Sequence, residues 1–312
     1  MTGVSLNPES EGSQPLLLSA TGEQTAPARE SRDGALLEAI ASRQPDYAYG
    51  GEYERRRKGR PMVSVVIPTL NEEPNLPFVL PRISAWIDEI VIVDGQSTDR
   101  TLEVARDLLP HVTIVHQPGK GKGDALRAGF EAARGDLIIM LDADGSTDPR
   151  EIPAFVGALV AGADFAKGTR FAQGAGTADM SWLRRLGNKG FVLTVRLLFG
   201  GHFSDMCYGY IAFWKRVLPV LDLDSDGFEI ETQMNLQALR AGLRIVEVPS
   251  FERLRIHGTS NLRTFPDGWR VLKTILRERL RPRRTWNLAP DTDHDPVPEL
   301  TGVLTSRSWT FL

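Results

Sequence analysis

Cysteine is nearly absent from this chain of 312 residues, in which Cys207 is the single example. The sequence therefore excludes an intramolecular disulfide and a thiolate metal cluster, and it indicates a reducing compartment. The five histidines show neither HxxxH nor HExxH spacing, so zinc hydrolase chemistry is not expected. We expect Cys207 to be a small buried side chain.

Long apolar runs and an excess of charge of one sign are also missing. No stretch of about 18 apolar residues occurs, so we expect no transmembrane helix. The N-terminus lacks the pattern of a signal peptide. The formal net charge is only −3, which implies no bulk attraction to nucleic acid. These absences predict a cytoplasmic protein.

Composition divides the chain into three parts. Residues 1–60 are rich in Ser, Gly, Glu, Pro and Arg, and residues 282–312 repeat that character. Such segments cannot bury enough surface to offset the entropy of ordering, so we predict flexible tails. Residues 61–281, about 220 positions, have the size of a single α/β domain.

The central part is predicted to alternate strands and helices. Strands are expected at 62–67, 90–93, 112–116 and 137–141, with helices that begin near residue 71 or cover 100–109 and 123–133. The strands are apolar throughout rather than alternating, which is typical of strands covered on both faces. The pattern predicts a doubly wound, mostly parallel sheet flanked by helices.

Polar residues follow three of these strands. The segment Pro68–Glu72 follows the first strand, Asp94 the second, and Asp142 and Asp144 the fourth. Ligands of parallel sheets bind at the carboxyl ends of the strands. Mg²⁺ and Mn²⁺ prefer oxygen ligands and usually keep substrate phosphates among them. The alternative is that the two acids only end the strand and cap a helix that begins at Pro149.

A glycine-rich stretch at residues 119–124 invites a phosphate-loop interpretation. A Walker loop needs Ser or Thr after Gly-Lys, and a dinucleotide fingerprint needs a third glycine where this chain has Asp124. A flexible turn into a helix is at least as well supported. Lys120 and Lys122 could still meet a phosphate at the N-terminus of that helix.

Three segments together, residues 64–72, 93–99 and 142–144, resemble the family 2 glycosyltransferases. These are inverting enzymes with the GT-A fold that use nucleotide sugars, and the resemblance runs from residue 63 to residue 280. It implies that one set of residues binds the nucleotide sugar: Pro68, Asn71, Glu72, Asp94, Lys122 and Asp142. It also implies that Mg²⁺ or Mn²⁺ binds Asp142, Asp144 and Ser146.

Two further segments resemble the branch of dolichyl- and polyprenyl-phosphate sugar synthases. Residues 168–171 are similar to its GSRY segment, and residues 255–262 to its RxxGxSKL motif. Asn261 stands where that branch has Lys, and residues 205–210 replace its D-x-TSGF segment. These departures weaken the transfer of substrate identity. No transmembrane helix follows the domain, as in members of the branch that sit on the membrane surface.

The acceptor decides which groups the reaction needs. A polyprenyl phosphate is already ionised at neutral pH and needs cationic groups to position it. The candidates are Arg170, Arg184, Arg185 and Arg255, with Ser260 beside them. A hydroxyl acceptor would instead need a carboxylate base, for which Asp205, Glu229 and Glu231 are the candidates.

Two segments bear on membranes. Residues 182–199 and 269–281 both mix arginines with Leu, Val and aromatic residues. Such a segment can lie in a lipid interface or pack on the domain as an amphipathic helix. The second segment is followed by Arg283 and Arg284, which favours the membrane surface.

We therefore predict a peripheral enzyme at the inner face of the cell membrane that transfers a hexose to a polyprenyl phosphate. The donor is expected to be of the GDP-mannose or UDP-glucose type. One alternative is a soluble family 2 glycosyltransferase with a hydroxyl acceptor. Another is a sugar nucleotidyltransferase, which should have a glycine-rich signature after the first strand. A non-catalytic nucleotide-binding protein should have lost one of the three strand-end Asp positions. The sequence carries no signal for the oligomeric state.

Overall fold

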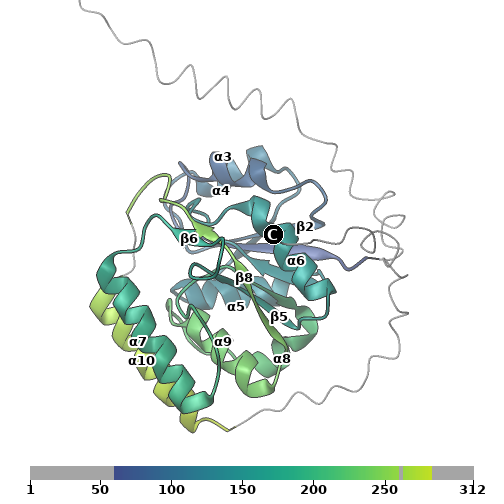
Figure 1. Ribbon diagram of the computed structural model, residues 1–312. Helices are drawn as coiled ribbons and strands as arrows, with labels where there is room; N and C mark the ends of the chain where they lie inside the picture. The colour runs from purple at the N-terminus through teal and green to yellow at the C-terminus, as the bar shows by residue number, and fades with distance from the viewer. Residues whose placement is uncertain (1–59, 260–262, 283–312) are drawn as a thin grey trace, which may run out of the picture. The chain divides into compact units, whose positions relative to one another are not determined.

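A seven-stranded sheet organises the residues that the structure describes, 60–259 and 263–282 of a computed structural model (Figure 1). The tails predicted at 1–60 and 282–312 lie outside those residues, except Arg60 and Pro282. The strand order is β3-β2-β1-β4-β7-β5-β8. The strands are β1 (Val63–Thr69), β2 (Glu89–Asp94), β3 (Thr113–His116), β4 (Leu137–Met140), β5 (Phe165–Thr169), β7 (Ile211–Trp214) and β8 (Ile245–Pro249).

One strand of this sheet runs against the others. β7 is antiparallel to its neighbours β4 and β5, whereas all other neighbours pair in parallel. The amino end of β7 therefore lies at the same edge as the carboxyl ends of β4 and β5. Gly168 N donates to Tyr210 O at 2.7 Å across this junction. The prediction of a mostly parallel sheet is confirmed. The direction of β7 brings residues 205–210 to the edge of the sheet where the parallel strands end.

Helices cover both faces of the sheet (Figure 1). α5 (Lys122–Ala132), α8 (Leu218–Leu221) and α9 (Ile230–Ala241) share one apolar core with the sheet. On the other face, α6 (Ile152–Val160) places the Phe155 ring 4.2 Å from the Tyr210 ring. The remaining elements are α3 (Leu76–Val79), α4 (Thr101–Leu108), α7 (Trp182–Phe199), α10 (Thr264–Leu280), the 3-10 helices Leu80–Arg82, Pro149–Glu151 and Lys215–Val217, and the short parallel pair β6 (Gly176–Thr177) and β9 (Phe251–Glu252).

The predicted elements agree with the structure in all but one place. The four predicted strands are confirmed to within two residues at each end. The helix expected near Asn71 is wrong, because Asn71 adopts φ 56° and α3 begins only at Leu76. A residue in the left-handed region cannot continue a right-handed helix, so the chain makes a turn there first.

Helices α7 and α10 lie side by side (Figure 1). Val195 of α7 and Val271 and Ile275 of α10 are buried in one cluster with Met206 and Leu236. Each helix therefore packs one face on the domain, as the amphipathic alternative predicts. Within residues 60–259 and 263–282, no helix combines the length and the apolar character needed to cross a membrane.

The contact of α5 with the sheet depends on Gly129. A Cβ atom there would lie 2.4 Å from Val66 Cγ1 and 2.7 Å from Val93 Cγ2. We expect Gly129→Ala to lower the free energy of unfolding by about 1–3 kcal/mol, because the core would be overpacked. Gly157→Ala in α6 is the matched control, since a Cβ there meets no atom within 4 Å. It should stabilise by about 0.5–1 kcal/mol. Urea denaturation measures both, and equal effects would contradict the packing argument.

Candidate functional site

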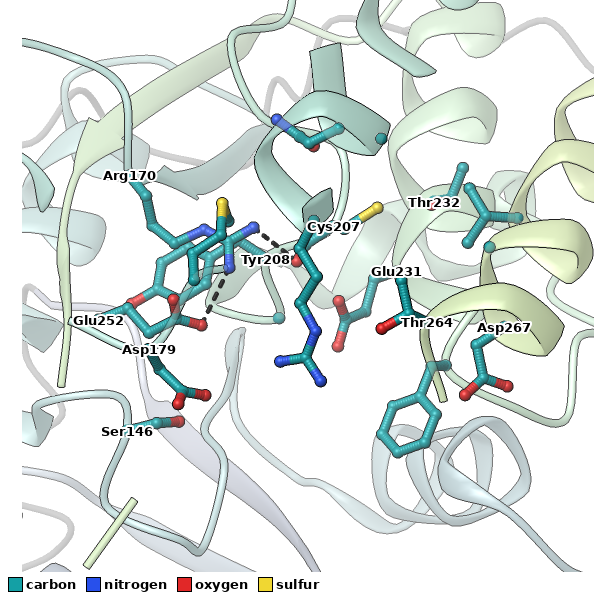
Figure 2. Close-up of a pocket in the computed structure, with 18 of the residues that line it drawn as sticks. Ser146, Arg170, Asp179, Cys207, Tyr208, Glu231, Thr232, Glu252, Thr264 and Asp267 are labelled. Carbon is teal, nitrogen blue, oxygen red and sulfur yellow. Dashed lines mark hydrogen bonds and ion pairs between the residues drawn. The ribbon is translucent and has the colours of Figure 1, made fainter. Parts of the chain in front are cut away.

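A pocket opens at the edge of the sheet where β4 and β5 end (Figure 2). Its walls come from the loop after β4 and from α5, α7, α9 and α10. Eight of the residues predicted from the sequence line it: Lys122, Asp142, Asp144, Ser146, Arg170, Arg184, Glu231 and Arg255. The fold thus gathers side chains that are up to 133 positions apart in the sequence.

Asp142 shares a cation with Glu231. Lys122 Nζ lies 2.7 Å from Asp142 Oδ1 and 2.7 Å from Glu231 Oε1. Burial raises the pKa of Asp142 to about 6, against the opposing effect of the Lys122 ammonium. Burial also disfavours the charge on Lys122, but the two carboxylates outweigh it and raise the pKa of Lys122 above its usual range. The ammonium therefore stays charged and neutralises acids from two elements.

Asp144 has a cation of its own. Arg255 Nη2 lies 2.7 Å from Asp144 Oδ2, and Ser146 N donates to Asp144 Oδ1 at 2.8 Å. Neither Asp144 nor Asp142 caps a helix. That role belongs to Asp148, whose side chain accepts from Arg150 N at 3.1 Å. The alternative that the Asp pair only caps a helix is therefore wrong.

The donor set at this strand end fits a hard divalent cation. Asp142 and Asp144 offer carboxylate oxygens, and Ser146 lines the same pocket. No cluster of three or more His, Cys, Asp or Glu suited to a metal ion occurs among the described residues. Two carboxylates and one hydroxyl would fill only part of the ligand shell of Mg²⁺ or Mn²⁺, which usually keep substrate phosphates. A bound ion would have to replace Lys122 and Arg255 at the two carboxylates.

Arg170 is fixed by a buried network. Its Nε and Nη2 lie 2.7 Å and 2.9 Å from the two oxygens of Asp205. Its Nη1 lies 2.9 Å from Glu252 Oε1 (Figure 2). The Tyr208 ring centre is 4.8 Å from the guanidinium carbon. Burial raises the pKa of Asp205, but the hydrogen bonds from Arg170 outweigh it and lower that pKa below its usual range. Arg170 is therefore held in one orientation.

The three candidate bases lie in different surroundings. Asp205 is fully buried behind Arg170 and is not among the residues that line the pocket. Glu229 precedes α9 and accepts from Gly227 N at 3.3 Å, also outside the lining. Glu231, in the first turn of α9, lines the pocket. Only Glu231 therefore faces a substrate in that space.

The other residues predicted to bind the acceptor also differ in whether they line the pocket. Arg184 lines the pocket, whereas the Arg185 guanidinium lies 5.9 Å from the centre of the Phe171 ring. Ser260 falls outside the described residues. Of the predicted acceptor residues, Arg170, Arg184 and Arg255 therefore line the pocket.

The predicted nucleoside residues lie together beyond the pocket lining. Asn71 Oδ1 accepts from Thr98 N at 2.8 Å, which ties the loop after β1 to the loop after β2. Asp94 accepts from Ser97 N at 3.1 Å and lies 3.4 Å from His116 Nδ1. Pro68 lies within β1, where it pairs with Val93 of β2. The ends of β1 and β2 thus form one surface.

Glu72 connects that surface to the Asp pair. Burial raises the pKa of Glu72, and the hydrogen bond from Asn75 opposes the shift. The charges of Asp144 and Asp142 raise this pKa further. Glu72 is therefore near enough to the two acids for their charges to act on it.

The glycine-rich stretch has a packing role. Cβ atoms at Gly121 and Gly123 would lie 2.3 Å from Asp226 O and 2.0 Å from Ser225 O. Gly123 N donates to Asp226 O at 2.7 Å. The glycines thus admit a crossing backbone segment, and the interpretation as a turn into a helix is confirmed. Lys122 points into the pocket, while Lys120 is exposed.

Several lining residues were not predicted from the sequence. They are Asp179, Met180, Leu183, Gly187, Asn188, Phe191, Cys207, Tyr208, Gly209, Phe228, Thr232, Glu252, Thr264, Asp267, Gly268 and Val271. Asn188 and Asp267 are buried polar residues within amphipathic helices, a signal that could have indicated a site. Burial raises the pKa of Cys207 to about 12, so its thiol is protonated and inert at neutral pH.

Comparison with known proteins places these features in context. The profile described as Glycosyl transferase family 2 matches residues 64–221. The low-salt glycan biosynthesis hexosyltransferase Agl6 of Haloferax volcanii is 34% identical over 224 residues, 69% of this chain and 53% of that protein. A dolichol-phosphate mannosyltransferase of Pyrococcus furiosus is 33% identical over 64% of this chain and 59% of its own length. This chain thus spans little more than half of these two relatives.

Two further comparisons cover more of the other protein. The polyprenol monophosphomannose synthase of Mycolicibacterium smegmatis is 34% identical over 59% of this chain and 75% of its own length. Glucosyl-3-phosphoglycerate synthase from Mycobacterium tuberculosis, solved with Mn²⁺, UDP and glucosyl-3-phosphoglycerate, superimposes with a TM-score of 0.57 at 22% identity. That match covers 78% of this chain and 92% of the other. It establishes a common GT-A fold.

The Arg170–Asp205 pair yields a test of the site's rigidity. We expect Asp205→Asn to lower the free energy of unfolding by about 3 kcal/mol, because a buried charge loses its partner. Since folding lowers the pKa of Asp205, its stabilisation is present at neutral pH and is lost as pH falls through the folded-state value. The variant should lack this acid-sensitive component in denaturation curves measured between pH 7 and pH 3.

Glu103→Gln is the matched control for that variant. Its exposed pair with Arg100 has a distance of 2.7 Å, yet such surface pairs contribute about 0–1 kcal/mol. An Asp205→Asn variant as stable as Glu103→Gln would contradict the role assigned to the buried network.

Proposed function

Because this chain belongs to glycosyl transferase family 2, we propose that it transfers a hexose from a nucleotide-diphosphate sugar to a polyprenyl phosphate, with inversion. Residues 61–281 would form the catalytic domain. The observation that carries the proposal is a pocket whose wall runs from Asp142 and Asp144 to the side of α7 that bears Leu183, Arg184 and Phe191. Family membership removes the nucleotidyltransferase alternative.

On the donor side, the charged residues would hold the sugar diphosphate. A bound Mg²⁺ or Mn²⁺ supplies a Lewis acid that stabilises the departing diphosphate. Asp142, Asp144 and Ser146 are the residues that would hold the ion. Lys122 and Arg255, now paired with those acids at 2.7 Å, would turn to the phosphate oxygens. Both of these cationic side chains already lie in the pocket.

The nucleoside would bind at the ends of β1 and β2. Asp94 can accept hydrogen bonds from a base N–H, and the loop with Asn71 and Glu72 lies beside it. Because the two loops are tied by the Asn71–Thr98 hydrogen bond at 2.8 Å, they would form a preorganised surface. This organisation lowers the cost of ordering on binding.

On the acceptor side, the phosphate would be positioned rather than deprotonated. Arg170 offers a guanidinium whose orientation is fixed by Asp205 and Glu252, and Arg184 lies in the same wall. Apolar side chains complete this part of the pocket: Met180, Leu183, Phe191 and Val271. They would contact the first isoprene units of the lipid. The relatives named for polyprenol and dolichol phosphate support this acceptor class.

A hydroxyl acceptor is the second candidate. Of the three candidate bases, Glu231 is the one that lines the pocket, and a structural neighbour was solved with phosphoglyceric acid. Glu231 is also ion-paired with Lys122 at 2.7 Å, which weakens it as a base. This pairing favours an acceptor that is already ionised.

The proposed reaction is tested with a donor-by-acceptor assay. GDP-mannose and UDP-glucose are offered with Mg²⁺ or Mn²⁺ to decaprenyl phosphate, dolichyl phosphate and phosphoglyceric acid. We expect transfer to a lipid phosphate, with the anomeric configuration inverted in the product as observed by NMR. Transfer to phosphoglyceric acid alone would overturn the acceptor and favour the second candidate.

Asp144→Ala serves as the active-site control in this assay. It should lower metal-dependent turnover by about two orders of magnitude or more, because the leaving group loses its stabilisation. Asp107→Ala changes an exposed acid on α4 and should leave turnover unchanged. Circular dichroism checks that both variants keep the fold, and retained turnover in Asp144→Ala would refute the role of Asp144.

We also propose that α7 and α10 attach the enzyme to an anionic lipid surface. Large apolar side chains are exposed with the same spacing on both helices: Trp182, Leu186, Leu193 and Leu197 on α7, and Phe265, Trp269, Leu276 and Leu280 on α10. Exposed cationic side chains lie on the same helices: Arg185, Lys189 and Arg196, and Arg270, Lys273 and Arg279. Apolar and aromatic residues among cations are typical of interfacial helices.

Vesicle flotation tests this attachment. The protein should float with vesicles of phosphatidylcholine and phosphatidylglycerol and should bind pure phosphatidylcholine more weakly. Trp182→Ala with Trp269→Ala should weaken binding by about tenfold or more, because buried aromatic area is lost. Val160→Ala removes apolar surface that is exposed on α6 instead and is the control. Equal binding by the double variant and the wild type would contradict the proposal.

A further inference from the structure

A short segment, residues 253–257, crosses the loop that carries the Asp pair. We call it the strap. Arg253 N donates to Ser146 O at 2.8 Å, and Ile256 N donates to Asp144 O at 3.0 Å. A Cβ at residue 145 would lie 2.4 Å from Ile256 Cδ1, so Gly145 lets the Ile256 side chain approach the loop. The strap is thus joined to the metal-binding loop by backbone hydrogen bonds and close packing.

The far end of the strap is held by Asn75. This side chain is 3% exposed and lies just before α3. Its Oδ1 accepts from His257 N at 2.9 Å, and its Nδ2 donates to His257 O at 3.3 Å. Nδ2 also donates to Glu72 Oε2 at 2.6 Å. Asn75 therefore pairs with the main-chain N–H and C=O of a residue 182 positions away and with the proposed nucleoside loop at once.

Arg255 lies between these two attachments. Its Nη2 is 2.7 Å from Asp144 Oδ2, and its side chain is one-quarter exposed in the pocket. Fixing the backbone on both sides of a long, flexible side chain lowers the entropy that is lost when that side chain is held in place. The bonds of Arg253 to Ser146 and of Ile256 to Asp144 lie on either side of Arg255, and Asn75 holds the next residue, His257.

We infer that Asn75 is a positioning residue that holds the strap, and with it Arg255, in the donor site. The inference rests on the proposed function, in which Arg255 meets the diphosphate of the donor. Without Asn75, the His257 end of the strap detaches, and the position of Arg255 then depends only on the bonds of Arg253 and Ile256 to the loop of the Asp pair. Binding of the nucleotide then weakens. The acceptor side, built on Arg170 and α7, is left as it was.

Hydrogen exchange tests the attachment directly. In the full-length protein, Asn75→Ala should speed exchange of the amides in residues 254–258 by about tenfold or more, while β8 keeps its protection. Asn75→Asp, which has nearly the same shape, removes the Nδ2 donor and places a carboxylate beside Glu72, so it should act alike. If Asn75→Ala does not fold, the exchange rates of Asn75→Asp test the attachment of the strap.

Asn235→Ala is the matched control. Asn235 is also a fully buried asparagine, and its Nδ2 donates to Met206 O at 3.4 Å within the α9 region. It should lower the melting temperature without changing exchange in the strap. Unchanged strap exchange in both Asn75 variants would overturn the inference, whatever the enzyme's activity.

Binding and kinetics test the consequence. Calorimetric titration with GDP and with UDP, each with MnCl₂, should show about tenfold weaker binding to the Asn75 variants. This factor is expected if the charged hydrogen bond from Arg255 to the diphosphate is lost. The donor KM should rise by the same factor, while kcat and the acceptor KM change by less than about twofold. Equal shifts of donor and acceptor KM would overturn the positioning role. Failure of every donor and acceptor pair would refute the proposed function, whereas the exchange data still decide whether Asn75 holds the strap.

Discussion

The pairing of each buried acid with a nearby cation is the constraint on which the rest of the site depends. Asp142 and Asp144 stand two positions apart at a strand end, where like charges in a partly buried space are unfavourable unless they are compensated. Lys122 and Arg255 supply that compensation from α5 and from the strap, each at 2.7 Å. The glycines before α5 and the attachment of the strap can both be understood as means of bringing these cations to the same place.

The direction of β7 has a comparable influence on the acceptor side. Because this strand is antiparallel, the segment before it reaches the edge where β4 and β5 end. Asp205 and Tyr208 thus surround Arg170, which follows β5, and Glu252 completes the network from β9. An all-parallel sheet would send the segment before β7 to the opposite edge. The mixed topology therefore provides the rigid guanidinium that a phosphate acceptor would need.

The sequence predicted the local features well and the distant pairings poorly. Continuous apolar runs located β1 to β4, and the acids after them located the site. Asn71 misled the helix prediction, since its left-handed backbone is set by tertiary contacts to Ser97 and Thr98. The partnership of Lys122 with Glu231, 109 positions away, has no local signature. Asp205 illustrates the limit most clearly, because its burial behind Arg170 decides its role and no motif records burial.

The hydrogen bond from Gly123 to Asp226 O, at 2.7 Å, has a consequence for how anions are recognised. The amino end of a helix normally offers fixed N–H groups and a positive dipole to a phosphate. In α5, the N–H group of Gly123 already donates to the carbonyl of Asp226 and is not available to a ligand. Negative charge in the pocket must then be met by the ends of long side chains, whose reach can change as a ligand arrives and leaves. Anion binding in this pocket therefore depends on mobile side chains rather than on the fixed N–H groups of a helix.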